Sequence, residues 1–285
     1  MNAGKLAVIY MSTRKTDKED SLKLAKLLKT HDEDELPIVA PPSDEEWERR
    51  KLLSEYRSLK CQRTKEINKL HAIFEHNGYT QFVRKDMCSE KNRANILPLL
   101  KGYEKEEAER LVERLNLLEK QIERLLQKIN AEVENDGKIQ KVMTVPGIGP
   151  ITALAYVAYV GDVNRFDNAH QVSNFIGFVP KVDNSCTICR SGHTTKKGNP
   201  LLRSLLVQAA WSTVKSKNGG ALRDKYKYMA ESRCIGKGKS IVTIARKLGE
   251  LLYLILKTDQ EYKPQKFITP ELKISKLAED ALECS

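Results

Sequence analysis

Hydroxyl groups and cations lie close together between residues 185 and 203, in the stretch SCTICRSGHTTKKGNPLLR. A hydroxyl held among cations can attack the phosphorus of a phosphodiester once a base or a metal ion removes its proton. The hydroxyls of this stretch that could do so are Ser185, Ser191, Thr194 and Thr195. Its neighbouring cations are Lys196, Lys197 and Arg203. These residue types point to phosphodiester chemistry, and the alternative is an ordinary polar loop beside a solvated run of charge.

Asn199 and Pro200 mark the start of a helix directly after the two lysines. Asn accepts hydrogen bonds from the free N–H groups of a first turn, and Pro is favoured at the first helical position. Cations at this end oppose the helix dipole, so they need an anion or open solvent. We therefore expect Lys196, Lys197, Asn199 and Arg203 to contact phosphate groups.

Gly147 and Gly149 stand in the sequence VPGIGPITA, before an apolar helix that begins near Pro150. Glycines allow a turn to bring its backbone N–H groups up to a phosphate at a helix N-terminus. This is the form of a helix-hairpin-helix DNA contact. The alternative is a plain tight turn between two packed helices, and the basic region downstream favours the DNA contact.

Asp17 and Asp20 are three residues apart at the start of another helix, so their carboxylates face one side of its first turn. Such a pair can share a divalent cation such as Mg²⁺. Thr16 and Glu19 form a capping-box pattern, which explains the same residues as an ordinary helix start. Both interpretations stay open at this point.

Cys186, Cys189 and His193 have a spacing that could ligate zinc. A structural zinc site takes four ligands, and Cys234 is the sole nearby supplement. We therefore expect no zinc, with a zinc-stabilised module kept as an alternative. The six cysteines are scattered widely, which argues against a disulfide framework.

The net charge of +11 over 285 residues predicts a polyanionic partner. The excess is local, because fifteen Lys and Arg stand against three acidic residues between Lys181 and Lys247. We expect a basic surface in this C-terminal region. The absence of a signal peptide and of an apolar run of membrane-spanning length predicts a cytoplasmic protein with no membrane partner.

Four segments are expected to position these residues: 1–43, 44–138, 139–262 and 263–285. The first carries a strand at 5–10 and a helix at Ser21–Lys29, and the last is a polar tail. The second begins with a helix from Asp44 to about His76 and continues with a helix bearing an a/d seam of a coiled coil. The seam residues are Leu111, Leu115, Leu118, Ile122, Leu125 and Ile129. The two helices pair with each other as an antiparallel hairpin or with a second subunit.

Taken together, these residues resemble the transposases of the bacterial insertion-sequence one-ten family, which are DEDD-type enzymes with a RuvC-like domain and a serine-bearing C-terminal domain. The family pattern is a PGIG-like turn, G-x-x-P, a serine loop and K-x-G-N-x-x-L-R. It is matched by Pro146–Gly149, Gly177–Pro180, Ser185 and Lys196–Arg203. The resemblance covers about residues 12–260. It implies a mainly α fold, with a remnant of an α/β RuvC-like (RNase H-like) domain, a coiled-coil hairpin and a C-terminal helical domain.

The resemblance implies a transposase that binds element ends and target DNA and rejoins strands by Mg²⁺-assisted serine transesterification. Ser185 would be the nucleophile. Ser191 is held in reserve, because Cys186 stands where the family has a small glycine. The family's K-T-D-x-x-D-A element resembles Lys15–Asp20, so Asp17 and Asp20 would hold Mg²⁺.

The family's first Asp and its Glu have no counterpart in this sequence, so the resemblance implies an N-terminally truncated copy whose catalytic activity is open. It also implies a structured guide RNA, a homo-oligomer and association with the nucleoid. The alternative is a catalytically inactive protein that binds nucleic acid and oligomerises through its coiled coil.

Overall fold

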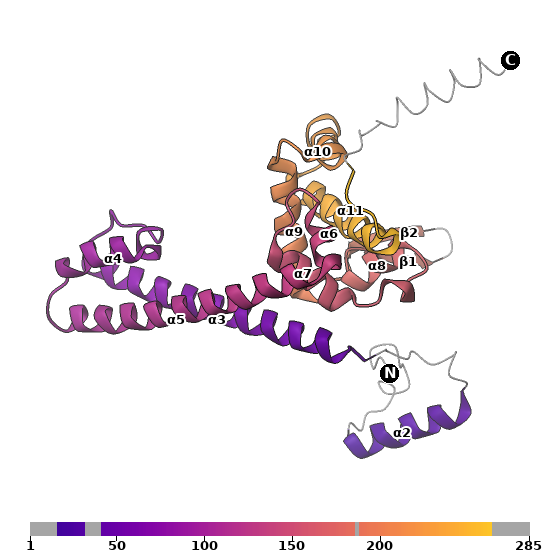
Figure 1. Ribbon diagram of the computed structural model, residues 1–285, viewed down its shortest axis with the longest axis horizontal. Helices are drawn as coiled ribbons and strands as arrows, with labels where there is room; N and C mark the ends of the chain where they lie inside the picture. The colour runs from indigo at the N-terminus through magenta and orange to yellow at the C-terminus, as the bar shows by residue number, and fades with distance from the viewer. Residues whose placement is uncertain (1–15, 32–40, 186–187, 264–285) are drawn as a thin grey trace. The chain divides into compact units, whose positions relative to one another are not determined.

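The computed structural model describes residues 16–31, 41–185 and 188–263. The contacts of the chain divide it into two units, 1–44 and 45–285. Helices make up most of the described residues, and the β-structure among them is one two-stranded hairpin (Figure 1). The predicted mainly α fold is confirmed. The expected strand at residues 5–10 lies outside the described residues, so the RuvC-like remnant stays a prediction.

In the first unit, helix α2 runs from Asp17 to Thr30. Thr16 is its N-cap, and the Oγ1 atom accepts a hydrogen bond from the Glu19 N–H at 3.3 Å. The helix start predicted by the Thr16 and Glu19 pattern is therefore confirmed, and it extends the expected helix Ser21–Lys29 by four residues. Acidic side chains in its first turn also suit the positive end of the helix dipole.

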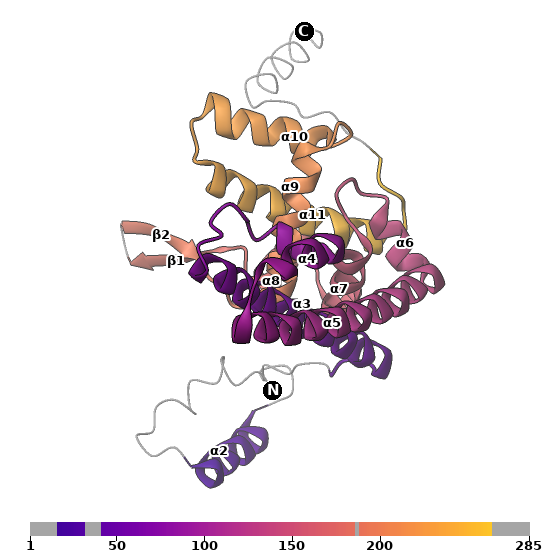
Figure 2. The same cartoon turned by 90° about the vertical axis from the view of Figure 1, so that its left-hand side faces the viewer.

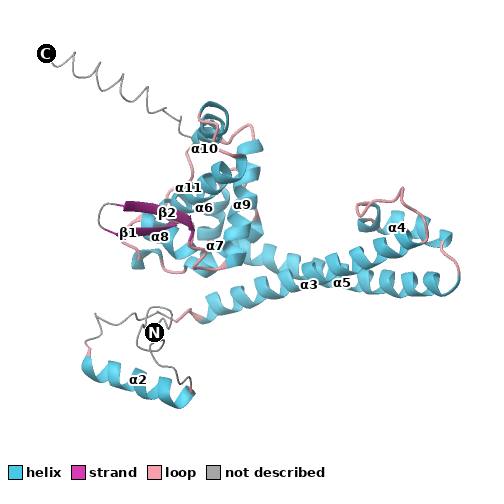
Figure 3. Cartoon of the chain, turned by 180° about the vertical axis from the view of Figure 1, so that it is seen from behind, coloured by secondary structure: helices cyan, strands magenta, loops and turns pink. Residues whose placement is uncertain are grey.

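Helices α3 (Asp44–His76) and α5 (Gly102–Asn135) lie side by side and run in opposite directions (Figures 1 and 3). The ion pairs between them follow an antiparallel order and join Arg49 to Glu132, Arg63 to Glu119, and Arg114 to Glu66. Of the six predicted seam residues on α5, all are buried except Leu118, which is half-buried. The two helices therefore pair with each other within the chain.

Three short elements connect α3 to α5: η3 (Asp86–Cys88), α4 (Glu90–Ile96) and η4 (Leu97–Leu99). They fold over the end of the helical pair that is remote from α6–α11 (Figure 1). The sequence analysis predicted no element between the two long helices. A separate apolar core forms here instead, from Ile67, Leu70, Phe74, Met87, Ile96, Leu100, Ala108, Leu111 and Leu115.

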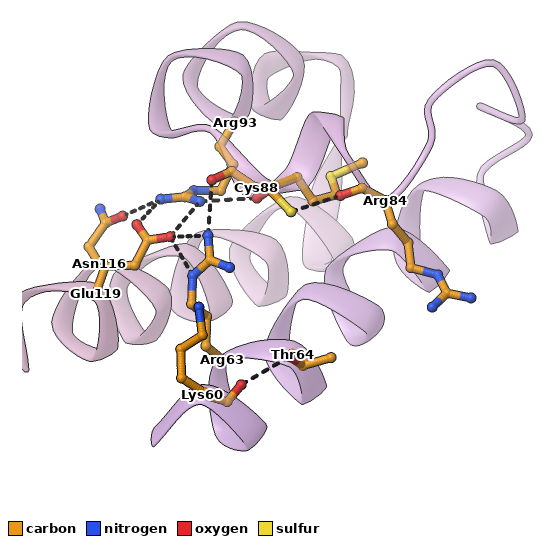
Figure 4. Close-up of polar contacts among 9 residues, drawn as sticks. Lys60, Arg63, Thr64, Arg84, Cys88, Arg93, Asn116 and Glu119 are labelled. Carbon is orange, nitrogen blue, oxygen red and sulfur yellow. Dashed lines mark hydrogen bonds and ion pairs between the residues drawn. The ribbon is translucent and has the colours of Figure 1, made fainter. Parts of the chain in front are cut away.

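A buried arginine ties α4 to the helical pair (Figure 4). The guanidinium of Arg93, which is 1% exposed, donates to Glu119 Oε2 at 2.7 Å and to Asn116 Oδ1 at 2.9 Å. Arg63 also pairs with Glu119 at 2.7 Å. Burial by itself raises the pKa of Glu119, but the hydrogen bonds from Arg93 and Arg63 outweigh it and hold that pKa below the usual value. Glu119 is thus the counter-ion of both arginines.

We expect Glu119→Ala to lower the free energy of unfolding of the helical pair by about 2–3 kcal/mol. This is less than the roughly 3–5 kcal/mol for a fully buried pair, because water reaches part of the carboxylate. Thermal unfolding followed by circular dichroism measures the change. Glu123→Ala is the matched control, since Glu123 is exposed one turn further along α5. Equal melting temperatures for the two variants would contradict this role of Glu119.

The C-terminal helices pack mainly on α11, and α7 is largely buried among them. In chain order they are α6 (Gly137–Met143), α7 (Pro150–Val160), η5 (Val163–Arg165), α8 (Ala169–Ile176), α9 (Pro200–Lys215), α10 (Gly220–Lys227), the π-helical turn η6 (Tyr228–Ser232) and α11 (Lys237–Thr258). Tyr156 on α7 is fully buried, and its hydroxyl donates to the Gly249 carbonyl of α11 at 2.6 Å. A continuous apolar core therefore holds α8, α9 and α11 in fixed positions.

In chain order, an antiparallel hairpin follows α8 and precedes α9 (Figure 2). It consists of strands β1 (Pro180–Ser185) and β2 (Ile188–Thr194). A loop was expected here, and that prediction is wrong. The two strands are mostly polar, so they lack the apolar alternation by which a half-buried strand is recognised. A backbone hydrogen bond at the base of the hairpin supports the pairing of the two strands instead. The Thr195 N–H donates to the Val179 carbonyl at 2.9 Å.

No helix of the described residues is long and apolar enough to span a membrane.

Candidate functional site

Two glycines fix the base of the β1–β2 hairpin to the end of α8. Gly177 ends α8 in the left-handed conformation, with φ of 87°, and its N–H donates to the Ser173 and Asn174 carbonyls. A Cβ atom at Gly198 would collide with the Phe175 carbonyl and come within 2.6 Å of the Ile176 carbonyl oxygen. The Lys196–Asn199 turn can cross the end of α8 this closely because position 198 has no side chain.

The start of α9 follows the prediction. The Asn199 side chain accepts hydrogen bonds from the Leu201 N–H at 2.8 Å and the Leu202 N–H at 3.2 Å, and Pro200 is the first helical residue. Arg203 reaches back to α8, where its guanidinium donates to the Ile176 carbonyl at 3.1 Å. Partial burial lowers the pKa of Arg203. Arg203 thus has a structural partner, and its contact with phosphate stays a prediction.

The structure brings the predicted cations together at the base of the hairpin. Lys196 and Lys197 are exposed, and Lys196 has a φ of 52°, which is unusual for a residue with a side chain. The backbone N–H of Lys197 lies 3.0 Å from where a Cβ of Gly177 would stand, and Nη1 of Arg203 lies 3.1 Å from the same point. The turn that carries the lysines and the first turn of α9 therefore both contact Gly177, at the C-terminal end of α8.

The hairpin carries both candidate nucleophiles. Ser185 is the last residue of β1 and pairs with Ile188, whereas Ser191 lies within β2 and pairs with Val182. The side chains of residues 181–193 are outside the description, so the choice between Ser185 and Ser191 stays a prediction. Thr195, next to the lysines, has a buried hydroxyl without a hydrogen-bond partner among the described residues.

The predicted metal ligands do not form a complete site. Cys186 lies outside the described residues, and the side chains of Cys189 and His193 are not described either. Asp17 is exposed, and Asp20 has an Oδ1 atom 3.8 Å from Lys23 Nζ. No group of three or more His, Cys, Asp or Glu that could hold a metal ion is found in the described ranges. Two carboxylates beside a lysine do not fit a Mg²⁺ site by themselves.

The glycine turn between α6 and α7 packs against α9. Gly147 has a φ of 93°, and a Cβ there would stand 2.5 Å from Thr213 Oγ1 and 2.9 Å from the Ala209 carbonyl oxygen. The Thr213 hydroxyl donates to the Pro146 carbonyl at 2.7 Å. The space beside Gly149 is open. Packing of helices thus explains Gly147, and the phosphate contact at Gly149 and the first N–H groups of α7 stays a prediction.

A second group of charges escaped the sequence analysis. Glu250 on α11 accepts hydrogen bonds from the Ser173 hydroxyl at 2.9 Å and from Lys247 Nζ at 2.6 Å, and Arg246 Nε lies 3.8 Å from its carboxylate. Burial raises the pKa of Glu250, but the Lys247 and Ser173 hydrogen bonds outweigh it and lower that pKa overall. The ion pairs of Glu250 with Lys247 (i,i+3) and Arg246 (i,i+4) could have been predicted from their spacing on one helix. Nothing in the sequence indicates the bond to Ser173.

Residues 139–227 match the family model described as "Transposase IS116/IS110/IS902 family". The chain is 37% identical over 105 residues to a "Probable family 20 transposase" of Pseudomonas aeruginosa, with 37% of this chain and 31% of the relative covered. It is 30% identical over 139 residues to the "Transposase for insertion sequence element IS1111A" of Coxiella burnetii, with coverage of 48% and 38%.

A third relative is the "Transposase for insertion sequence element IS1328" of Yersinia enterocolitica, 24% identical over 200 residues, with coverage of 69% and 59%. The chain thus spans less than two thirds of the length of each of these three relatives. The matched family segment begins in α6 and ends with α10, so it includes the glycine turn, the hairpin and the basic turn before α9. Residues 139–227 thus match the model of the IS116/IS110/IS902 transposase family, which is the family that the sequence motifs resemble.

Proposed function

We propose that this chain acts on the DNA of a mobile insertion sequence as a transposase, which binds the strands and exchanges them by transesterification at Ser185. The observation that carries the proposal is the junction at the end of α8. Through Gly177 and Gly198, the hairpin that bears Ser185 and the basic turn that bears Lys196 and Lys197 are held against one helix end. This junction supports the proposal, because Ser185 and the two lysines lie on neighbouring segments.

The proposed step conserves the number of phosphoester bonds. The Ser185 hydroxyl oxygen attacks the phosphorus of one DNA phosphodiester, a serine–phosphate bond forms and the bond from phosphorus to one deoxyribose oxygen breaks. The serine proton ends on the released deoxyribose hydroxyl. A second strand's hydroxyl can then attack the same phosphorus and return the serine, so no external energy source is required.

The cations contribute electrostatically to this proposed step. Negative charge builds on the phosphate oxygens as the nucleophile approaches, and cations held in place beforehand stabilise it more than mobile ones do. Lys196 and Lys197 would supply this charge at the base of the hairpin, and Arg203 would do so as far as its bond to α8 allows. The α6–α7 turn would bind backbone phosphate at Gly149 without reading sequence.

DNA, a structured guide RNA and further copies of the chain are the proposed partners, and Mg²⁺ is the proposed cofactor. The match of residues 139–227 to a transposase family model supports the DNA partner. The RNA, the oligomer and the ion rest on the resemblance alone, and so does association with the nucleoid.

Incubation of the chain with element-end DNA, guide RNA and Mg²⁺ tests the proposal. We expect a covalent protein–DNA adduct that survives denaturing electrophoresis. Binding to the DNA without an adduct would instead support the alternative, a non-catalytic nucleic-acid-binding protein. A gel-shift titration of the same samples separates the two outcomes, because it reports binding whether or not a bond forms.

A further inference from the structure

Apart from the basic turn before α9, a carboxylate beside α8 pairs with two cations of α11, and a third cation lies on the neighbouring helix α10. Lys247 and Arg246 on α11 flank Glu250, and Lys225 comes from α10. Glu250 is bonded in turn to Ser173 on α8. Ser173 is one helical turn before Ile176, whose carbonyl accepts from Arg203. The group is therefore anchored on the same end of α8 that positions the hairpin.

Glu250 is fixed firmly in its place. Its side chain is 13% exposed and takes hydrogen bonds from Ser173 on one oxygen and from Lys247 on the other. Charge-assisted hydrogen bonds of this kind are short and directional. The carboxylate is therefore a rigid support that orients Lys247 and Arg246 on the surface of α11.

The positive charge of this group exceeds its negative charge. Lys247 and Arg246 pair with the single carboxylate of Glu250, and Lys225 lies on α10, which packs against α11. Three cations and one carboxylate leave a formal charge of +2. Burial lowers the pKa of Lys225, and the nearby charges of Lys247 and Arg246 lower it further, against the opposing effect of Glu250. Lys225 and Arg246 donate no hydrogen bond within the described residues, and the buried Arg246 Nε has only the 3.8 Å ion pair with Glu250. Among the described residues, Glu250 is the carboxylate that ion-pairs with this group, and it balances one of the three positive charges.

We propose that Lys225, Arg246 and Lys247, organised by Glu250, bind a phosphodiester group of a nucleic-acid backbone. This inference rests on the proposed function and extends it from the basic turn before α9 to α10 and α11. Phosphate fits because it carries charge and several acceptor oxygens for the donors of a guanidinium and two ammonium groups. Such a contact fixes the position of the strand and reads no sequence.

The test compares Lys225→Met with Lys225→Arg, which keeps the charge, and with Lys120→Met, an exposed lysine on α5 that has the same effect on net charge. Each full-length protein is titrated with a duplex DNA and with an RNA hairpin at several salt concentrations. We expect Lys225→Met to bind several-fold more weakly and to reduce the slope of log affinity against log salt by about 1. Lys225→Arg and Lys120→Met should keep the slope of the unsubstituted protein.

A reduced slope on the duplex alone or on the RNA alone supports the proposal and identifies the strand that is bound. Unchanged slopes on both ligands for a folded Lys225→Met protein would overturn it, and leave the proposed function standing. Failure of the unsubstituted protein to bind either ligand would overturn the proposed function as well. Melting temperatures of all variants show whether each protein is folded.

Discussion

Ser185→Ala is expected to abolish the protein–DNA adduct and to leave DNA binding within about twofold of the unsubstituted chain. An alanine has no oxygen to attack phosphorus, and removal of a nucleophile typically lowers a rate by roughly 1000-fold or more. Binding should persist, because phosphate contacts from lysines and backbone N–H groups supply most of the affinity for DNA. Denaturing gels measure the adduct, and gel shifts measure the binding.

Ser191→Ala is the matched control for that change. It removes the same hydroxyl from the other strand of the same hairpin, where Ser191 pairs with Val182. We expect adduct formation to continue in this variant. Loss of the adduct in Ser191→Ala, with retention in Ser185→Ala, would transfer the role of nucleophile to Ser191.

Gly147→Ala is expected to destabilise the C-terminal helices by about 3 kcal/mol, which combines the strain of a positive φ with overpacking. The added methyl group would stand 2.5 Å from Thr213 Oγ1 and 2.6 Å from the Thr213 backbone nitrogen, and a backbone atom cannot rotate away. A destabilisation of this size lowers a melting temperature by roughly 6–12 °C in a domain of this size. Calorimetry of the full chain measures it.

Gly149→Ala provides the control two residues away. Its backbone φ of −99° suits any residue, and no atom lies within 4 Å of the added methyl group. We expect an unchanged melting temperature and weaker DNA binding, because the methyl group would obstruct a phosphate at the start of α7. A melting temperature for Gly147→Ala within 1 °C of that for Gly149→Ala would show that the α6–α7 turn does not need glycine for packing on α9.

The sequence predicted the long helices well, because each has local signals. The α3 bounds match the predicted helix from Asp44 to His76, and the seam on α5 follows from its apolar spacing. Asn199 and Pro200 are short-range cap signals, and α9 begins where they predict. Such features depend on neighbouring residues in one chain segment, so a sequence reveals them.

Features that depend on distant contacts were missed. The β1–β2 hairpin has polar strands and is closed by the bond from Thr195 to Val179. Nothing in the sequence around Arg93 indicates that it is buried, because its partner Glu119 lies 26 positions further along the chain. The candidate site shows the same limit. Its basic turn was predicted from local residue types, whereas the hydrogen bond from Ser173 to Glu250 joins residues 77 positions apart and has no local signal.

Identification of the residue that carries DNA tests the central claim most directly. The adduct is digested with nuclease and protease, and mass spectrometry locates the peptide that retains a nucleotide phosphate. We predict a phosphoester on Ser185, at the end of β1. A phosphoester on a residue outside the β1–β2 hairpin, or DNA retained with no covalent bond to any residue, would contradict the account.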